Sequence, residues 1–172
     1  AMAVGIVKTD GIVSAVAKGE GNPLMIVGSK TGRDGIHGAT FASEELSEKS
    51  EAKRPAVQIG DPFTEKLLLE ATLEIIEQDL VIGIQDMGAA GIACSTAELA
   101  SAASMGMQVD LDLVHLREPS MESWEILCSE SQERMLALCS PDDLDEVLAL
   151  ADTWGVPASV LAKAGVPRTR ST

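Results

Sequence analysis

The sequence predicts an α+β fold, an α/β sandwich built on a mixed sheet. Predicted strands and helices alternate from residue 56 onward, while the first part of the chain is rich in predicted strands. Such alternation is typical of a sheet covered by helices. At 172 residues the chain is long enough to bury a core as a single domain.

The first third of the chain supplies the predicted strand-rich part. Val4–Val7 and Ile12–Ser14 predict a β-hairpin that turns at Asp10-Gly11. Leu24–Val27 is a continuous aliphatic run, which predicts a buried strand. The polar stretch Ser43–Lys53 is typical of a solvated loop or a frayed helix.

The next elements are a strand at Ala56–Ile59 and a helix that reaches Gln78. Asp61 is a favourable N-cap and Pro62 suits the first helical position. An apolar stripe of Phe63, Leu67, Ala71 and either Leu73 or Ile75 predicts a largely buried helix. The remaining predicted elements are a strand at Val81–Gln85, a helix at Ala89–Ala103, a strand at Val109–Leu113, a helix at Met121–Cys128, a strand at Arg134–Leu138, a helix from Ser140–Asp143 to Thr153, and a strand at Val156–Leu161.

Composition argues against several classes of function. The net charge of −14 repels a phosphate backbone, and aromatic residues make up only 2% of the chain, so we expect no nucleic-acid partner. No stretch is long and apolar enough to cross a bilayer, so we expect no membrane partner. The three cysteines, Cys94, Cys128 and Cys139, are far apart and odd in number, which indicates reduced thiols and a cytoplasmic protein.

The segment Gly28–Thr40 is the densest cluster of glycines and charges in the chain. Its glycines allow the backbone to approach a ligand or another segment closely, and Lys30, Arg33 and Asp34 supply both signs of charge. An ordered connector and a ligand-binding loop both fit this pattern. His37 and His115 lack any metal-ligand spacing and have no evident nucleophile nearby in the sequence.

Polar residues at the ends of predicted strands are the candidates for chemistry. Gln58 ends one strand just before a helix, and Asp86 ends the next strand, again before a helix. Ligands collect at such positions in α/β sheets. Asp86 suits either a helix N-cap or a Mg²⁺ ligand, and Gln58 suits either a polar strand end or a contact to substrate.

The polar run Ser129–Arg134 is the third candidate. It lies between a predicted helix and an aliphatic strand, and its serine, glutamate and glutamine side chains can recognise hydroxyls and amides. A solvated connection is the alternative explanation of the same composition.

Several segments together resemble the family of the phosphoribosylformylglycinamidine synthase large subunit, PurL. The resemblance runs in order from about residue 4 to residue 161. It is carried by TDGI (Thr9–Ile12), AKGEGNP (Ala17–Pro23), TGRDGIHGATFASEEL (Thr31–Leu46), QIGDPFTEKLLLEA (Gln58–Ala71), GIQDMGAAGI (Gly83–Ile92), VDLDLVHLRE (Val109–Glu118) and SESQERML (Ser129–Leu136). Among related enzymes such as aminoimidazole ribonucleotide (AIR) synthetase and selenophosphate synthetase, the last segment favours PurL.

The resemblance implies an ATP- and Mg²⁺-dependent ligase that forms a C–N bond in purine synthesis. Formylglycinamide ribonucleotide and ammonia, which a glutaminase subunit or domain releases from glutamine, give the amidine. The implied fold is three-layer α/β/α with partial likeness to the ferredoxin fold, as in the C-terminal-type domain of AIR synthetase. The family's catalytic histidine belongs to an N-terminal-type partner domain, so we expect no catalytic residue here, an inactive isolated chain and possible self-association. A non-catalytic binding or assembly module with this fold is the alternative.

Residue by residue, the resemblance assigns substrate contacts to Gln58, Glu130, Ser131 and Gln132 and a Mg²⁺ ligand to Asp86. It assigns no role to the glycine-rich segment. The chain departs from the family pattern after Leu161, so we expect a domain over residues 1–161 and an atypical, disordered tail over residues 162–172.

Overall fold

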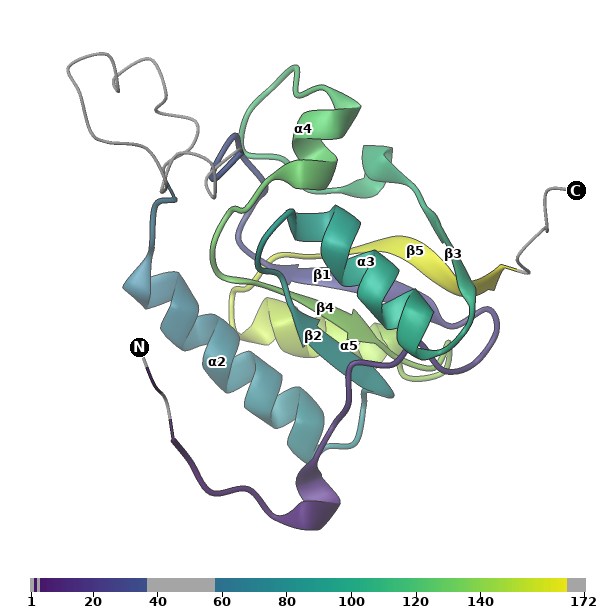
Figure 1. Cartoon of the computed structure of the whole chain (residues 1–172). Helices are drawn as coiled ribbons and strands as arrows, with labels where there is room; N and C mark the ends of the chain where they lie inside the picture. The colour runs from purple at the N-terminus through teal and green to yellow at the C-terminus, as the bar shows by residue number, and fades with distance from the viewer. Residues whose placement is uncertain (1, 3, 37–57, 167–172) are drawn as a thin grey trace, which may run out of the picture.

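The computed structural model describes residue 2 and residues 4–36 and 58–166, and these form a sheet enclosed between two layers of helices (Figure 1). The sheet has five strands in the order β2-β4-β1-β5-β3. The strands are β1 (Pro23–Gly28), β2 (Gly83–Asp86), β3 (Gly106–Val109), β4 (Arg134–Leu138) and β5 (Ala158–Val166). The helices are α2 (Pro62–Glu77), α3 (Gly91–Ala102), α4 (Ser123–Cys128) and α5 (Leu144–Thr153), with short 3₁₀ turns at Thr9–Gly11 and Leu111–Leu113.

The predicted α+β sandwich is confirmed, but the prediction of a mixed sheet is wrong. All pairings between these described strands are antiparallel. Strands that follow one another in the sequence are never neighbours in the sheet order. Each helix therefore lies in a connection between two strands that are separated in the sheet by at least one other strand. Strands that are neighbours in the sheet run in opposite directions, although strands and helices alternate along the chain.

The two faces of the sheet each have a hydrophobic core, which gives the three layers. Leu24 and Ile26 of β1 pack on the face covered by α3 and α4, together with Ile92, Leu99 and Ile126. Met25 and Val27 point to the opposite face, where α2 and α5 contribute Leu68, Ala71, Ile75, Val147 and Ala151. This alternation is the period-two geometry of a strand, and β1 is buried along its whole length as predicted.

Helix α2 begins as the sequence predicted, but it buries a different stripe. The Asp61 carboxylate accepts hydrogen bonds from the backbone N–H groups of Phe63 and Thr64, at 3.1 and 3.2 Å. Phe63 is 73% exposed, because successive steps of four residues each rotate about 40° beyond a full turn and carry position 63 off the buried face. Of the two alternatives, Ile75 is buried and Leu73 is exposed.

Three further predictions of secondary structure are wrong. The N-terminal hairpin is absent, and Val4, Ile6 and Ile12 are exposed on either side of a 3₁₀ turn. The strand predicted at Val109–Leu113 ends at Val109, because the Asp110 carboxylate accepts from the Asp112 N–H at 3.1 Å and begins a turn. Of the strand predicted at Ala56–Ile59, Gln58 and Ile59 lie outside any strand, and residues 56 and 57 lie outside the described residues.

The C-terminal boundary also differs from the prediction. β5 continues to Val166, five residues beyond the expected domain end, and pairs with both β1 and β3. Residues 162–166 are therefore a central part of the sheet and not a tail. Residues 167–172, His37 and the predicted loop or helix Ser43–Lys53 lie outside the described residues.

Two smaller observations bear on the sequence predictions. In the described part of the chain, no helix is both long and apolar enough to cross a membrane. All three cysteines are free; Cys139 is buried and Cys94 is exposed. Burial raises the pKa of the Cys139 thiol to about 11, which makes it an unreactive thiol.

Candidate functional site at one edge of the sheet

The register of the sheet brings three connecting segments to one edge. Gly28 at the end of β1 pairs with Arg134 at the start of β4, and Asp86 at the end of β2 pairs with Met135. The segments after β1, after β2 and before β4 therefore meet at this edge, where α2 and α3 also begin (Figure 1). The candidate residues from the sequence all lie in or beside these segments.

Glu130 is the centre of the candidate site. Its carboxylate accepts from Gln58 Nε2 at 2.7 Å and from the backbone N–H of Ala90 at 3.0 Å. Ala90 is the N-cap residue of α3, in left-handed conformation, and its own side chain cannot cap the helix. Glu130 thus places a negative charge at the N-terminus of α3, where the helix dipole favours it.

Ser131 is buried beside Glu130 and is held by the glycine-rich segment. Its hydroxyl donates to the Asp34 carboxylate and accepts from the Gly32 N–H at 2.9 Å. Neighbouring Ser129 donates to the Gly32 carbonyl at 2.6 Å. The Ser131 hydroxyl is therefore a fixed group in a polar interior, only 2% exposed.

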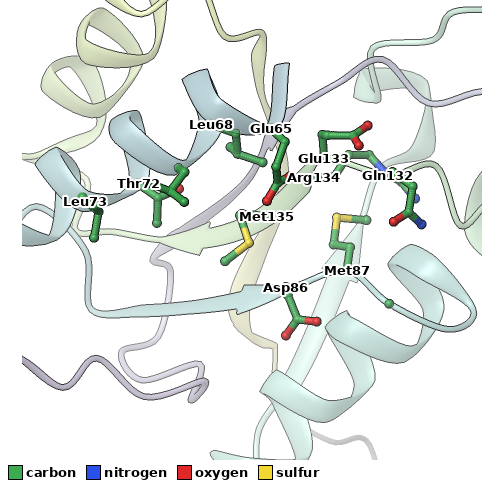
Figure 2. A pocket seen from close by; sticks show the side chains of 12 residues that line it. Glu65, Leu68, Thr72, Leu73, Asp86, Met87, Gln132, Glu133, Arg134 and Met135 are labelled. Carbon is green, nitrogen blue, oxygen red and sulfur yellow. The ribbon is translucent and has the colours of Figure 1, made fainter. Parts of the chain in front are cut away.

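Gln132 lies where two cavities adjoin. Its side-chain amide donates to the Glu130 carbonyl at 3.1 Å. It lines a cavity of about 340 Å³ together with Lys30, Arg117 and Ser131, and a second of about 390 Å³ together with Asp86. Figure 2 shows the second cavity, with Glu65, Leu68, Thr72 and Leu73 projecting from α2 and Gln132 and Glu133 beside the start of β4.

Asp86 occupies the exposed end of β2 in the same cavity. The described residues contain no group of three or more histidine, cysteine, aspartate or glutamate side chains able to hold a metal ion. A single exposed carboxylate still fits Mg²⁺, which commonly keeps several waters and takes one or two carboxylates plus phosphate oxygens. Asp86 can therefore serve as one ligand, but the described residues do not form a complete metal site.

Arg134 is a structural centre of the site, although the sequence predicted it only as the last residue of the polar run Ser129–Arg134 and the first of a strand. Its side chain is buried and donates from Nε to the Ser131 carbonyl and from one terminal nitrogen to the Ser129 carbonyl, both at 2.7 Å. The other terminal nitrogen donates to the Thr31 hydroxyl at 2.9 Å. Burial lowers the pKa of Arg134 to about 10, although the Asp34 charge opposes the shift. The signal available in the sequence was an arginine that opens an otherwise aliphatic strand.

Two more arginines hold the glycine-rich segment in place. Arg117 donates to both Asp34 oxygens, at 2.9 and 2.8 Å, and this bond raises the pKa of Arg117. Arg33 pairs with Glu125 at 2.8 Å and Glu118 at 3.1 Å, and the bond to Glu125 makes the largest contribution to raising the pKa of Arg33. Arg33 and Asp34, two of the three charges noticed in the glycine-rich segment, thus form internal ion pairs.

A comparison with known protein families assigns the chain to one of them. Residues 19–169 match the model described as AIR synthase related protein, C-terminal domain. The chain belongs to this family. The matched range includes all five strands and every candidate site residue.

Curated relatives confirm the resemblance to PurL. The chain is 57% identical over 163 residues to the phosphoribosylformylglycinamidine synthase subunit PurL of Thermoanaerobacter sp. (strain X514). It is 58% identical over 166 residues to PurL of Chlorobium luteolum (strain DSM 273 / BCRC 81028 / 2530). These alignments cover 95% and 94% of this chain but 22% of each relative, so the chain spans about a fifth of their length.

Solved structures give the same result. T. maritima PurL complexed with FGAR superposes with a TM-score of 0.84 at 46% identity, over 92% of this chain and 26% of that one. T. maritima PurL complexed with ATP gives 0.78 at 41% identity, over 92% of this chain and 24% of that one. E. coli HypE, at 16% identity and a TM-score of 0.64 over 91% of this chain and 47% of that one, shares the fold.

Proposed function

We propose that this chain forms the part of a phosphoribosylformylglycinamidine synthase that binds formylglycinamide ribonucleotide. The observation that carries the proposal is that Gln58 donates to the Glu130 carboxylate and Gln132 to the Glu130 backbone carbonyl, with Ser131 next in the chain. This group lies at the same edge of the sheet as Asp86. The similarity to a PurL that was solved with FGAR supports this substrate.

The side chains suit an uncharged amide and a ribose. Gln58 and Gln132 carry carboxamides, which both donate and accept hydrogen bonds, and Glu130 accepts them. Lys30 lines the adjoining cavity and supplies positive charge in a chain of net charge −14. Fixed polar groups of this kind orient a substrate more than they add to its affinity, because their own hydrogen bonds are already formed.

The proposed overall reaction consumes ATP and ammonia. The amide oxygen of the substrate takes the γ-phosphoryl group of ATP, which releases ADP. Ammonia then attacks the amide carbon and displaces inorganic phosphate, which gives the amidine. Asp86 would hold Mg²⁺, which neutralises phosphate charge during such a transfer. The role of this chain's own residues is to bind and orient the nucleotide.

The proposed partners are those that the family resemblance implies. An N-terminal-type domain would supply the catalytic histidine and most contacts to ATP, and a glutaminase would supply ammonia, in the cytoplasm. Exposed apolar side chains on α2, namely Phe63, Leu69 and Leu73, are consistent with a surface that another domain covers. Uncovered, such a surface favours self-association.

Calorimetric titration of the chain with formylglycinamide ribonucleotide tests the proposal. We expect saturable binding that Gln58→Ala weakens, with Gln78→Ala at the far end of α2 as the matched control. Turnover should be absent from the chain alone and should appear when the N-terminal-type domain is added in trans. Failure of the chain to bind the nucleotide would favour a non-catalytic assembly module, and turnover by the chain alone would refute the need for a partner domain.

A further inference from the structure

The glycine-rich segment contacts the proposed substrate residues directly. Asp34 is 4% exposed, and its backbone carbonyl accepts from the Glu130 N–H at 2.8 Å. Its carboxylate accepts from the Ser131 hydroxyl and, at 2.9 and 2.8 Å, from Arg117. One residue therefore fixes both the backbone of Glu130 and the side chain of Ser131.

Gly35 adds a steric constraint beside Asp34. Its φ is +64°, and a Cβ built there would lie 2.5 Å from Glu130 Cβ and 3.1 Å from Gln58 Cγ. Two side chains that bond to each other thus pack against a backbone with no room for a methyl group. The same Cβ would lie 2.8 Å from Glu130 Oε2, the oxygen that accepts from Gln58.

The segment is anchored immediately before these two residues. Thr31 is fully buried, its N–H donates to the His115 carbonyl at 3.0 Å, and its hydroxyl accepts from Arg134. Arg33 is held by Glu118 and Glu125. Residues 31–35 therefore form a fixed support, and their contacts to Glu130 and Ser131 determine where these residues lie.

We propose that Asp34 and Gly35 are positioning residues that set Glu130 and Ser131 for binding of the nucleotide substrate. This inference rests on the proposed function and gives the glycine-rich segment a role in it. Neither residue needs to touch the substrate, since each acts through a residue that does.

Asp34→Asn is the primary test, because it keeps the shape and removes the charge. One Asp34 oxygen accepts from Ser131 and from Arg117, and the other accepts from Arg117. An asparagine must turn its NH₂ group toward one of these sites, so at least one donor then faces another donor. The loss of a hydrogen bond to a charged group corresponds to about a 10- to 100-fold weaker interaction.

The measurement is made in a complete synthase that carries this sequence. We expect Asp34→Asn to raise the KM for formylglycinamide ribonucleotide about tenfold or more while the KM for ATP stays unchanged. A merely destabilised protein would lose active enzyme and lower the maximal rate without this selective change in KM. Asp152→Asn, an exposed position on α5, is the charge-matched control and should leave both KM values unchanged.

Gly35→Ala is the second variant, and amide hydrogen exchange is the second measurement. The added methyl group should displace Glu130 and raise the same KM without removing any charge. In the isolated chain, Asp34→Asn should speed exchange of the Glu130 and Gly32 amides, while amides of β1 stay protected.

Each outcome separates this inference from the proposed function. Failure of the wild-type synthase to bind the nucleotide overturns the proposed function. The exchange data then show only whether Asp34 holds Glu130 and Ser131 in place. A wild type that binds normally, with both variants binding equally well or with the ATP KM rising in parallel, overturns the positioning role alone. Loss of folding in both variants would overturn it too, in favour of a purely structural role.

Discussion

Two regions at the same edge of the sheet are built in opposite ways. The segments 28–36 and 129–134 are joined by buried polar groups, with Asp34, Ser131 and Arg134 each less than 5% exposed. Asp86 at the end of β2 is exposed to solvent, and within the described residues its carboxylate forms no hydrogen bond or ion pair. Under the proposed function, the buried region corresponds to a nucleotide-binding part that is organised before the ligand arrives. The open region would then be a metal-binding part that is completed by ligands from elsewhere.

Arg134→Met should have the largest effect on stability, and it tests the organised region. The change leaves the Ser129 and Ser131 carbonyls and the Thr31 hydroxyl without their donor in the interior. Breaking a buried charged network costs about 3–5 kcal/mol of unfolding free energy. Urea unfolding measures this loss of unfolding free energy, with Lys66→Met, at an exposed position on α2, as the control.

A loss below about 1 kcal/mol for Arg134→Met, equal to that of the surface control, would show that the network is not important for stability. The contrast between the two regions would then be wrong.

Gly91→Ala should have the next largest effect on stability, because Gly91, which follows the turn after β2, packs directly against Ser129 of the organised region. Gly91 begins α3 with a φ of +48°, and an added Cβ would collide with the Ser129 carbonyl. We expect a loss of about 2–4 kcal/mol from overpacking and backbone strain together.

Gly155→Ala is the matched control, since it has a φ of +68° and open space around the added methyl group. It should lose only the part due to backbone strain, about 1 kcal/mol. Equal losses in urea unfolding would show that α3 is not packed tightly on residue 129.

His115 gives the organised region a pH dependence. Its Nε2 lies 3.2 Å from the Gly28 carbonyl, which can only accept, so Nε2 carries the proton and Nδ1 accepts from Ser159 at 2.8 Å. Burial lowers the pKa of His115 from its ordinary value of 6.5, and the positive charges of Arg134 and Lys30 add to this shift. The unfolded chain therefore binds the proton more tightly, and stability should fall as the pH drops below about 6.5.

Urea midpoints at pH 7.5 and pH 5.5 measure this effect. His115→Gln keeps a donor and an acceptor but does not titrate, so it should remove the part of the pH dependence that His115 causes while His37 remains in both proteins. An unchanged difference between the two pH values would show that protonation of His115 does not disturb this region.

The contrast also explains which features the sequence could predict. Local patterns predicted the Asp61 cap, the buried strand β1 and the polar run before β4, because each depends on residues close together in the chain. The contact of Asp34 with Ser131 joins residues 97 positions apart, and it exists only because β4 pairs with β1. No periodicity encodes that pairing, so the prediction of a mixed sheet was wrong and the glycine-rich segment had no assigned role.

Asp86→Asn should change stability least, and it tests the open region. The side chain is exposed, so we expect a change within about 0.5 kcal/mol in urea unfolding. In a complete synthase the same variant should need a higher Mg²⁺ concentration for half-maximal activity, because a carboxamide is a weaker ligand for Mg²⁺ than a carboxylate. Asp152→Asn controls for the loss of one negative charge. A large loss of stability would show that Asp86 is part of the organised region. An unchanged Mg²⁺ requirement would show that this carboxylate does not hold the metal. The two regions would then differ in burial alone.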